Sequence, residues 1–291
     1  MRLAASVAAI ALAIAAVAGG ASIAHPGHGN QGASHPAERM TIAQAVAGEW
    51  RAAADRARDG SRHPVETLTF WQLGPGMRVV EIGPGGGYWT DILAPYLAAN
   101  GGTLIPTFRD PDLATEAQRA ARERFLSEYA ANPGLFGTIQ PGVLDPNSTK
   151  PIAEPGSVDL IISSRNFHGF YLQGTKDFVL RQMFAALKPG GYVGIEQHRG
   201  SAARAHDPST GYVRQDIVIS EMARAGFRFV ASSEINANPR DTKNHPFGVW
   251  TLPPVRRSAP AGQPENPNFD HAPYDAIGES DRMTLLFRKP G

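Results

Sequence analysis

Short β-branched runs alternate with helical patterns along most of this chain, and no other feature limits the fold as strongly. The runs at 77–82, 102–107, 137–143, 158–163, 192–197, 227–231 and 283–287 have the length and flanks of buried strands. Helical patterns occupy 88–99, 111–131, 177–187 and 212–225. Strands joined through helices pair in parallel with right-handed crossovers. The chain is therefore predicted to be an α/β protein with a doubly wound, Rossmann-like, mostly parallel seven-stranded sheet.

Two regions lie outside this alternation. Before it, the apolar spacing predicts a helix at 42–59, ended by Gly60, and a shorter helix at 64–73 that begins with Pro64. After the strand at 227–231, residues 235–281 are partly Pro-rich and show no regular pattern. Such a stretch predicts an irregular insertion or a lid over a site. We expect 41–291 to be a single domain.

The first 24 residues have the pattern of a secretory signal peptide. Arg2 precedes an uncharged, Ala-rich run of 16 residues, and Ala24 closes a small-x-small cleavage signal. An uncleaved membrane anchor is the alternative, although the run is short for a span. Residues 25–40 predict a flexible linker rich in Gly, His and Pro, whose histidines are an alternative metal site. We expect export to the periplasm and no membrane attachment after cleavage.

Charge and cysteine content exclude several classes of protein. The chain has 28 Lys and Arg against 27 Asp and Glu, so no basic field is present to hold a nucleic acid. Cysteine is absent, which excludes disulfides, Cys-ligated metals and a Cys nucleophile. The expected partner is a small molecule, and the sequence does not predict an oligomeric state.

A glycine-rich loop follows the first strand of the alternation, where doubly wound sheets bind ligands. Residues 81–87 read Glu-Ile-Gly-Pro-Gly-Gly-Gly. Gly83 and Gly85 allow a tight turn and a close approach to a ligand, and Gly87 allows close packing of the next helix. Tyr88 stands where a dinucleotide fingerprint needs glycine, and the lysine of a phosphate loop is missing. The loop therefore favours a nucleoside without phosphates, with a turn that binds nothing as the alternative.

In this setting, residues 81–87 resemble motif I of the class I methyltransferases that depend on S-adenosylmethionine (SAM). The Leu-Lys-Pro-Gly-Gly turn at 187–191 and the strand at 159–162 are similar to elements of the same family. A narrower resemblance, over 50–290, is to a group of exported bacterial proteins that are predicted methyltransferases. It rests on the segments 55–59, 62–64, 165–168, 196–199, 281–282 and 287–290.

The resemblance implies that SAM is the cofactor and that a small-molecule acceptor is methylated. The residues that it assigns to the cofactor are Glu81, Gly83, Pro84, Gly85, Gly87, Tyr88 and Asp110. The family usually has an acid at the end of the second strand, which bonds the ribose hydroxyls. Here the first acids after that strand are Asp110 and Asp112. Because the acid is displaced, the alternative function is an exported ligand-binding protein without methyl transfer.

Candidate catalytic residues follow the fourth and fifth strands. Methyl transfer needs an aligned approach, and a base is needed when the acceptor loses a proton. We predict His168 as that base and Asn166 as a group that orients the acceptor. Arg165, Glu196 and His198 are predicted to contact the substrate or to support the catalytic pair.

Each of these residues also has a plainer interpretation. His168 could only hold its own loop, and Glu196 could pair with Arg165 or Arg199. His168, Glu196 and His198 are also of the types that bind metals, although their spacing is not typical of a metal site. We predict no metal ion. Tyr88 and Trp89 are expected to line the crevice, where an aromatic face attracts a sulfonium as it attracts other cations.

Overall fold

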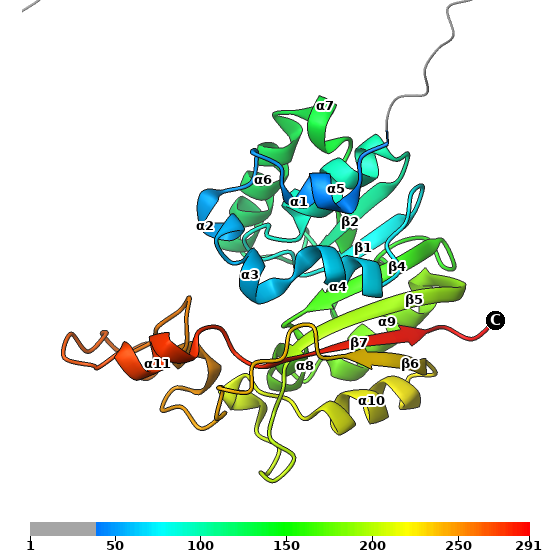
Figure 1. Cartoon of the computed structure of the whole chain (residues 1–291). Helices are drawn as coiled ribbons and strands as arrows, with labels where there is room; N and C mark the ends of the chain where they lie inside the picture. The colour runs from blue at the N-terminus through cyan, green and yellow to red at the C-terminus, as the bar shows by residue number, and fades with distance from the viewer. Residues whose placement is uncertain (1–38) are drawn as a thin grey trace, which may run out of the picture. The chain divides into compact units, whose positions relative to one another are not determined.

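The computed structural model contains one sheet of seven strands in the order β3-β2-β1-β4-β5-β7-β6 (Figure 1). β7 runs antiparallel to β5 and β6, and the other neighbouring strands are parallel. The predicted fold class, a doubly wound and mostly parallel seven-stranded sheet, is confirmed. The strands are β1 (Arg78–Ile82), β2 (Thr103–Phe108), β3 (Gly142–Val143), β4 (Val158–Ser164), β5 (Leu187–His198), β6 (Arg228–Ser233) and β7 (Arg282–Arg288).

The structure describes residues 39–291, which form one compact unit. The predicted signal peptide at 1–24 and nearly all of the predicted linker at 25–40 lie outside the described residues. In this described part of the chain, no helix has both the length and the apolar character needed to cross a membrane.

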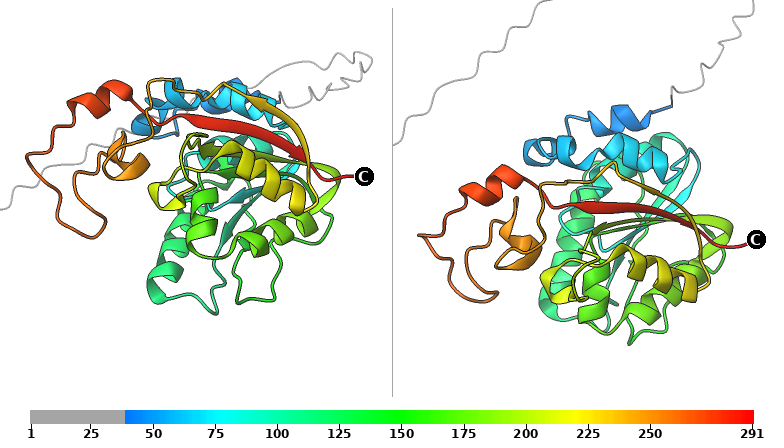
Figure 2. Two further views of the ribbon diagram at one scale, coloured as in Figure 1. Left: turned by 90° about the horizontal axis from the view of Figure 1, so that it is seen from below. Right: turned by 60° about the horizontal axis from the view of Figure 1, so that its bottom comes forward.

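Helices cover both faces of the sheet (Figure 2). One core joins Val79 of β1 to Trp71 and to the apolar side of α5, and the other joins Val80 to Met183 and Met222. Consecutive strand residues point to opposite faces, so β1 contributes to both cores and reads as a continuous apolar run. The helices are α1 (Ile42–Val46), α2 (Ala53–Arg56), α3 (Asp59–Arg62), α4 (Pro64–Phe70), α5 (Thr90–Ala99), α6 (Glu116–Ala130), α7 (Pro133–Phe136), α8 (Phe167–Leu172), α9 (Lys176–Ala186), η1 (Pro208–Thr210), α10 (Gln215–Arg224), η2 (Gly248–Thr251) and α11 (Ala272–Ile277).

The predicted helix at 42–59 is wrong, because α1, α2 and α3 replace it. The Trp50 ring lies over Gly48, where a Cβ would stand 2.2 Å from it, and Trp50 Nε1 donates to the Asp91 carbonyl at 2.8 Å. The buried guanidinium of Arg51 donates to the Val46 carbonyl at 2.5 Å. These side-chain contacts, of which the one to Asp91 is tertiary, accompany the breaks in the helix. The predicted helix that begins at Pro64 is present as α4.

The third strand is shorter than the predicted run at 137–143. Only Gly142 and Val143 pair with β2, because α7 occupies 133–136 and Pro141 has no N–H to donate. Gly142 is tightly placed, since a Cβ there would stand 2.6 Å from the Ile152 carbonyl oxygen. Helix α8 was not predicted, since six residues are too few to show a helical period.

The segment 235–281 holds η2 and α11 within irregular chain and extends past one end of the sheet (Figures 1 and 2). Buried hydrogen bonds tie the start of this segment to α4 and β7. The Asn236 amide donates to Thr67 Oγ1 at 3.0 Å and to Thr284 Oγ1 at 2.9 Å. Part of the stretch 249–255 lines the main cavity, so the irregular segment contributes one wall of the site.

Candidate functional site

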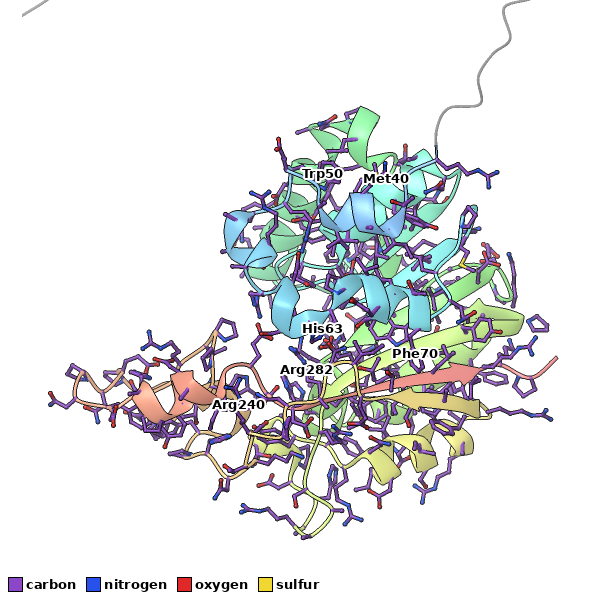
Figure 3. All side chains as sticks on the ribbon, in the orientation of Figure 1. Met40, Trp50, His63, Phe70, Arg240 and Arg282 are labelled. Atoms are coloured by element: carbon purple, nitrogen blue, oxygen red, sulfur yellow. The ribbon has the colours of Figure 1, made fainter. Side chains whose placement is uncertain are left out.

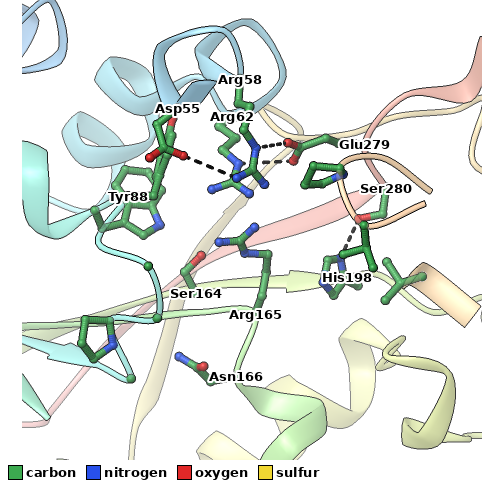
Figure 4. Close-up of a pocket in the computed structure, with 18 of the residues that line it drawn as sticks. Asp55, Arg58, Arg62, Tyr88, Ser164, Arg165, Asn166, His198, Glu279 and Ser280 are labelled. Carbon is green, nitrogen blue, oxygen red and sulfur yellow. Dashed lines mark hydrogen bonds and ion pairs between the residues drawn. The ribbon is translucent and has the colours of Figure 1, made fainter. Parts of the chain in front are cut away.

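The carboxyl ends of β1, β4 and β5 meet at one cavity, called the main cavity. The strand register places Ile82 beside Ser163 and Ser164 beside Glu196, so the loops that follow these strands lie together. A cavity of about 390 Å³ lies between those loops, α3 and part of the stretch 249–255 (Figure 4). Ligands bind doubly wound sheets at this edge.

The glycine-rich loop borders this cavity, and its glycines have different roles. Gly83, Gly85 and Gly87 have φ angles of 57°, 59° and 90°, a conformation that side chains rarely adopt. A Cβ at Gly87 would stand 2.5 Å from Tyr129 Oη, so this glycine allows α6 to pack closely against the loop. A Cβ at Gly85 would meet no atom within 4 Å. The loop is therefore open to a ligand at Gly85 and closed at Gly87.

Glu81, at the end of β1, is a buried carboxyl that lines the cavity. Burial raises its pKa from 4.5 to about 7, against the effect of a hydrogen bond that Thr90 Oγ1 donates at 2.6 Å. Tyr88 also lines the cavity, as predicted, and its hydroxyl donates to Asp59 at 2.7 Å. The guanidinium of Arg62 stacks on the Tyr88 ring, with its carbon 4.3 Å from the ring centre.

The residues after β4 have distinct hydrogen bonds. The Asn166 amide donates to the Ile82 carbonyl at 2.6 Å, which links the ends of β4 and β1. Arg165 has a φ of 59° and finds no side-chain hydrogen-bond partner among the described residues, and its Nε is buried. Burial, together with Arg282 and Arg58, lowers the pKa of Arg165, while Glu196 acts in the opposite direction.

His168 lines the cavity, and Gln197 controls which of its ring nitrogens carries the proton. Gln197 Oε1 accepts a bond from the Phe167 N–H at 3.0 Å, which fixes the orientation of the amide. Its Nε2 therefore faces His168 Nδ1 at 3.3 Å and donates to it. Burial and Arg165 lower the pKa of His168, which favours the neutral ring. A neutral ring that accepts at Nδ1 carries its proton on Nε2, so the geometry makes His168 a hydrogen-bond donor.

Glu196 pairs with neither Arg165 nor Arg199, which were its predicted alternatives. Its carboxylate lies 2.9 Å from Arg282 Nε and accepts a hydrogen bond from Ser164. Glu196 and Arg282 are both 1% exposed, so charge neutralisation requires this pairing. Arg282 comes from β7 and also donates to the Ser61 carbonyl, next to His63 (Figure 3).

His198 lines the cavity beside Glu279 and Ser280, and its Nδ1 lies 2.5 Å from Ser280 Oγ. Burial, with Arg165 and Arg282, lowers its pKa well below 6.5. The alternative of a metal site at His168, Glu196 and His198 is not supported. Within residues 39–291 no group of three His, Asp or Glu side chains is arranged to hold a metal ion.

Asp110 lies apart from these residues. Its carboxylate accepts bonds from Lys150 at 2.8 Å and Ser148 at 2.5 Å, which lower its pKa to about 2. Arg109 instead lines two smaller cavities, of about 210 and 300 Å³, which share Gly83, Thr107 and Phe108 with each other. An arginine therefore stands where the resemblance implies an acid, and Asp145 is engaged with it at 3.1 Å.

Several cavity residues were not among the predicted site residues. Arg58, Arg62 and Glu279 bring charge to the cavity, and Trp250 brings an aromatic face next to His168. In the sequence, the segments 55–59 and 62–64 had contributed only to the narrower family resemblance; in the structure, Arg58 lies 3.5 Å from Asp55. The closely spaced arginines between 51 and 62 were the one sequence feature that could have indicated charge at the site. Glu279 and Trp250 lie in the segment without periodicity, so no pattern indicated them.

No protein-family model and no curated protein matches the chain. Among solved structures it is similar to the [4+2]-cyclase SpnF, at 18% identity over 84% of this chain and 83% of that chain, with a TM-score of 0.47. It is also similar to a SAM-dependent methyltransferase from Aquifex aeolicus, at 22% identity over 62% and 87% of the two chains, with a TM-score of 0.44. It is similar as well to an S-adenosylmethionine-dependent methyltransferase from Mesorhizobium loti, at 18% identity over 77% of this chain and 97% of that chain, with a TM-score of 0.44. Identities and TM-scores this low carry no function over to this chain.

Proposed function

We propose that the protein is a SAM-dependent methyltransferase that acts on a small-molecule acceptor. The observation that carries this proposal is the loop at 83–87. It follows the first strand, resembles motif I of the family, and leaves open space at Gly85 next to the main cavity. Gly83 borders this cavity and both smaller ones, so one ligand could extend from this loop in two directions.

The residues around the loop fit most of the cofactor. The apolar side chains of Phe108, Leu144 and Phe170 line the smaller cavity of about 210 Å³ and suit a purine base. Arg58 and Glu279 bring opposite charges to the main cavity and pair with each other at 2.8 Å, so the amino-acid end of SAM would bind here only in exchange for this ion pair. The fit is poor at the ribose, because the carboxylate of Asp110 is occupied and Arg109 takes its place.

When bound, SAM supplies a methyl group on a sulfonium that a nucleophile can attack. The contribution of the chain is to hold the acceptor in a partly enclosed cavity and to fix its polar groups. His168 offers the N–H on Nε2 as a donor, and its predicted role as a base stays a prediction. Glu81, with a pKa of about 7, is the cavity carboxyl best suited to exchange a proton near neutral pH.

Calorimetric titration of the full-length chain with SAM and S-adenosylhomocysteine tests this proposal. The variant Gly85→Asn places a side chain in the open space, and Asn is the residue that best tolerates the left-handed conformation after Gly. Gly76→Asn is the matched control, since Gly76 also has a positive φ of 71° and no atom within 4 Å of its Cβ position. We expect micromolar binding that only Gly85→Asn abolishes.

Absence of heat with both ligands, from folded protein, would refute the cofactor assignment. A ligand-binding protein without methyl transfer would then be favoured, and Arg109 at the end of β2 is the observation that speaks for it. Export to the periplasm is part of the proposal and rests on residues 1–24. Mass spectrometry of the secreted protein is expected to find His25 at the N-terminus.

A further inference from the structure

Two arginines in the main cavity have buried N–H groups that no described residue accepts. Arg62 is 1% exposed, and its Nη1 and Nη2 have no partner. Arg165 makes no side-chain hydrogen bond, and its Nε is buried. In Figure 4, Arg62 comes from the helices above and Arg165 from the end of β4 below, and their guanidinium groups point toward each other. A buried charged donor without a hydrogen-bond partner is costly, so these groups are suited to a ligand whose oxygens accept hydrogen bonds.

The carboxylates around this pair are already engaged. Glu279 accepts from Arg58 at 2.8 Å, from Arg62 Nε at 3.3 Å and from Arg282 at 2.6 Å. Glu196 is held by Arg282 and Ser164. The protein therefore leaves Nη1 and Nη2 of Arg62 and Nε of Arg165 without an acceptor oxygen.

The Arg62 guanidinium is also held in place before any ligand arrives. It stacks on Tyr88 and is fixed through Nε by Glu279, so its two remaining nitrogens form a fork of constant direction. Guanidinium forks match the geometry of carboxylates and phosphates. Trp89, Trp250 and Leu252 give another part of the cavity an apolar lining, which suits a hydrocarbon or aromatic body.

We infer that the methyl acceptor is an organic oxyanion, that is, a carboxylate or a phosphate ester on an apolar body. Arg62 and Arg165 bind its charged group. The identity of this anion as the acceptor rests on the proposed methyltransferase function. The binding of an oxyanion by the two arginines does not depend on it. The carboxylate of SAM itself is the other anionic group that the two arginines could bind.

The test uses three probes of similar shape, benzoate, phenyl phosphate and the neutral benzamide. Binding to the full-length chain is measured by ligand-detected NMR, with and without saturating S-adenosylhomocysteine. We expect at least one of the anions to bind at least tenfold more tightly than benzamide, and to do so with S-adenosylhomocysteine present. Arg165→Gln is expected to weaken anion binding about tenfold, the loss of one charge-assisted contact, and Arg165→Lys to restore part of it.

Arg165 is chosen over Arg62 because it has no protein partner to lose, and Arg224→Gln on the surface of α10 is the matched control. Equal binding of benzamide and the anions, or binding that Arg165→Gln leaves unchanged, would overturn the inference. Displacement of the anions by S-adenosylhomocysteine would overturn it too, since the arginines would then hold the cofactor's carboxylate. If S-adenosylhomocysteine does not bind but the anions do, the oxyanion site is supported and the methyltransferase proposal fails.

Discussion

The substitution Arg165→Gln is expected to stabilise the protein while it removes a ligand contact. Its Nε is buried without a hydrogen-bond partner, and burial, Arg282 and Arg58 all disfavour the charge of the guanidinium. A buried charged donor without a partner costs about 1–3 kcal/mol. Glu196 and Glu279 offset part of this cost through longer-range attraction. We therefore expect the free energy of unfolding to rise by about 1–2 kcal/mol, within the range of that penalty.

Urea and thermal unfolding, followed by circular dichroism without ligand, measure this change. For a chain of this size, a gain of about 1–2 kcal/mol raises Tm by about 2–8 °C. Arg224→Gln is the control, because Arg224 is 71% exposed and its pairing with Glu221 should change stability by less than about 0.5 kcal/mol. A loss of more than about 1 kcal/mol in Arg165→Gln would refute the reasoning, since the attraction to Glu196 and Glu279 would then outweigh the desolvation.

Three further predictions concern buried groups near the site. Glu81→Gln removes a carboxyl whose pKa is raised to about 7 in the folded protein. This carboxyl stabilises the wild type fully below pH 4.5, and the stabilisation is lost as the pH rises through 7. In urea unfolding, the free energy of unfolding of the variant is therefore expected to gain about 3 kcal/mol relative to the wild type between pH 4.5 and 8. His168→Gln removes a ring whose pKa is lowered by burial, so the wild type is expected to lose more Tm than the variant as the pH falls from 7.5 to 5.5, because the unfolded chain takes up the proton first. Gly194→Ala is expected to cost about 1–3 kcal/mol in the same assay, because its Cβ would stand 2.4 Å from the buried Trp71 ring, whereas Gly60→Ala, with no atom within 4 Å, is expected to cost nothing.

The sheet could be predicted from the sequence because its central strands are buried on both faces. Burial of this kind produces continuous apolar runs such as 79–82, and these runs do not depend on any distant contact. The N-terminal helix at 42–59 could not be predicted correctly for the opposite reason. Its breaks lie where Trp50 donates to the Asp91 carbonyl and where the Arg51 side chain is buried, and neither the distant partner nor the burial can be read from the local pattern.

The candidate site divides in the same way. Residues that directly follow the strands, such as Gly85, Asn166 and His168, line the main cavity because the carboxyl ends of parallel strands share one edge. Asp110 follows β2 as closely, yet its carboxylate turns to Lys150 and Ser148, which the sequence places far away. Glu279 and Trp250 could not be assigned, because irregular chain has no period from which to read a direction.

The position of β7 makes the sheet dependent on its last strand. β7 follows the other six strands in the sequence but lies between β5 and β6, so it pairs with both. Until β7 is synthesised, β5 has a free edge and β6 has no neighbour in the sheet. Glu279 and Ser280 lie just before β7 and reach the cavity when it docks. A chain truncated before residue 279 is therefore expected to lack both the completed sheet and the side of the cavity that Glu279 and Ser280 form.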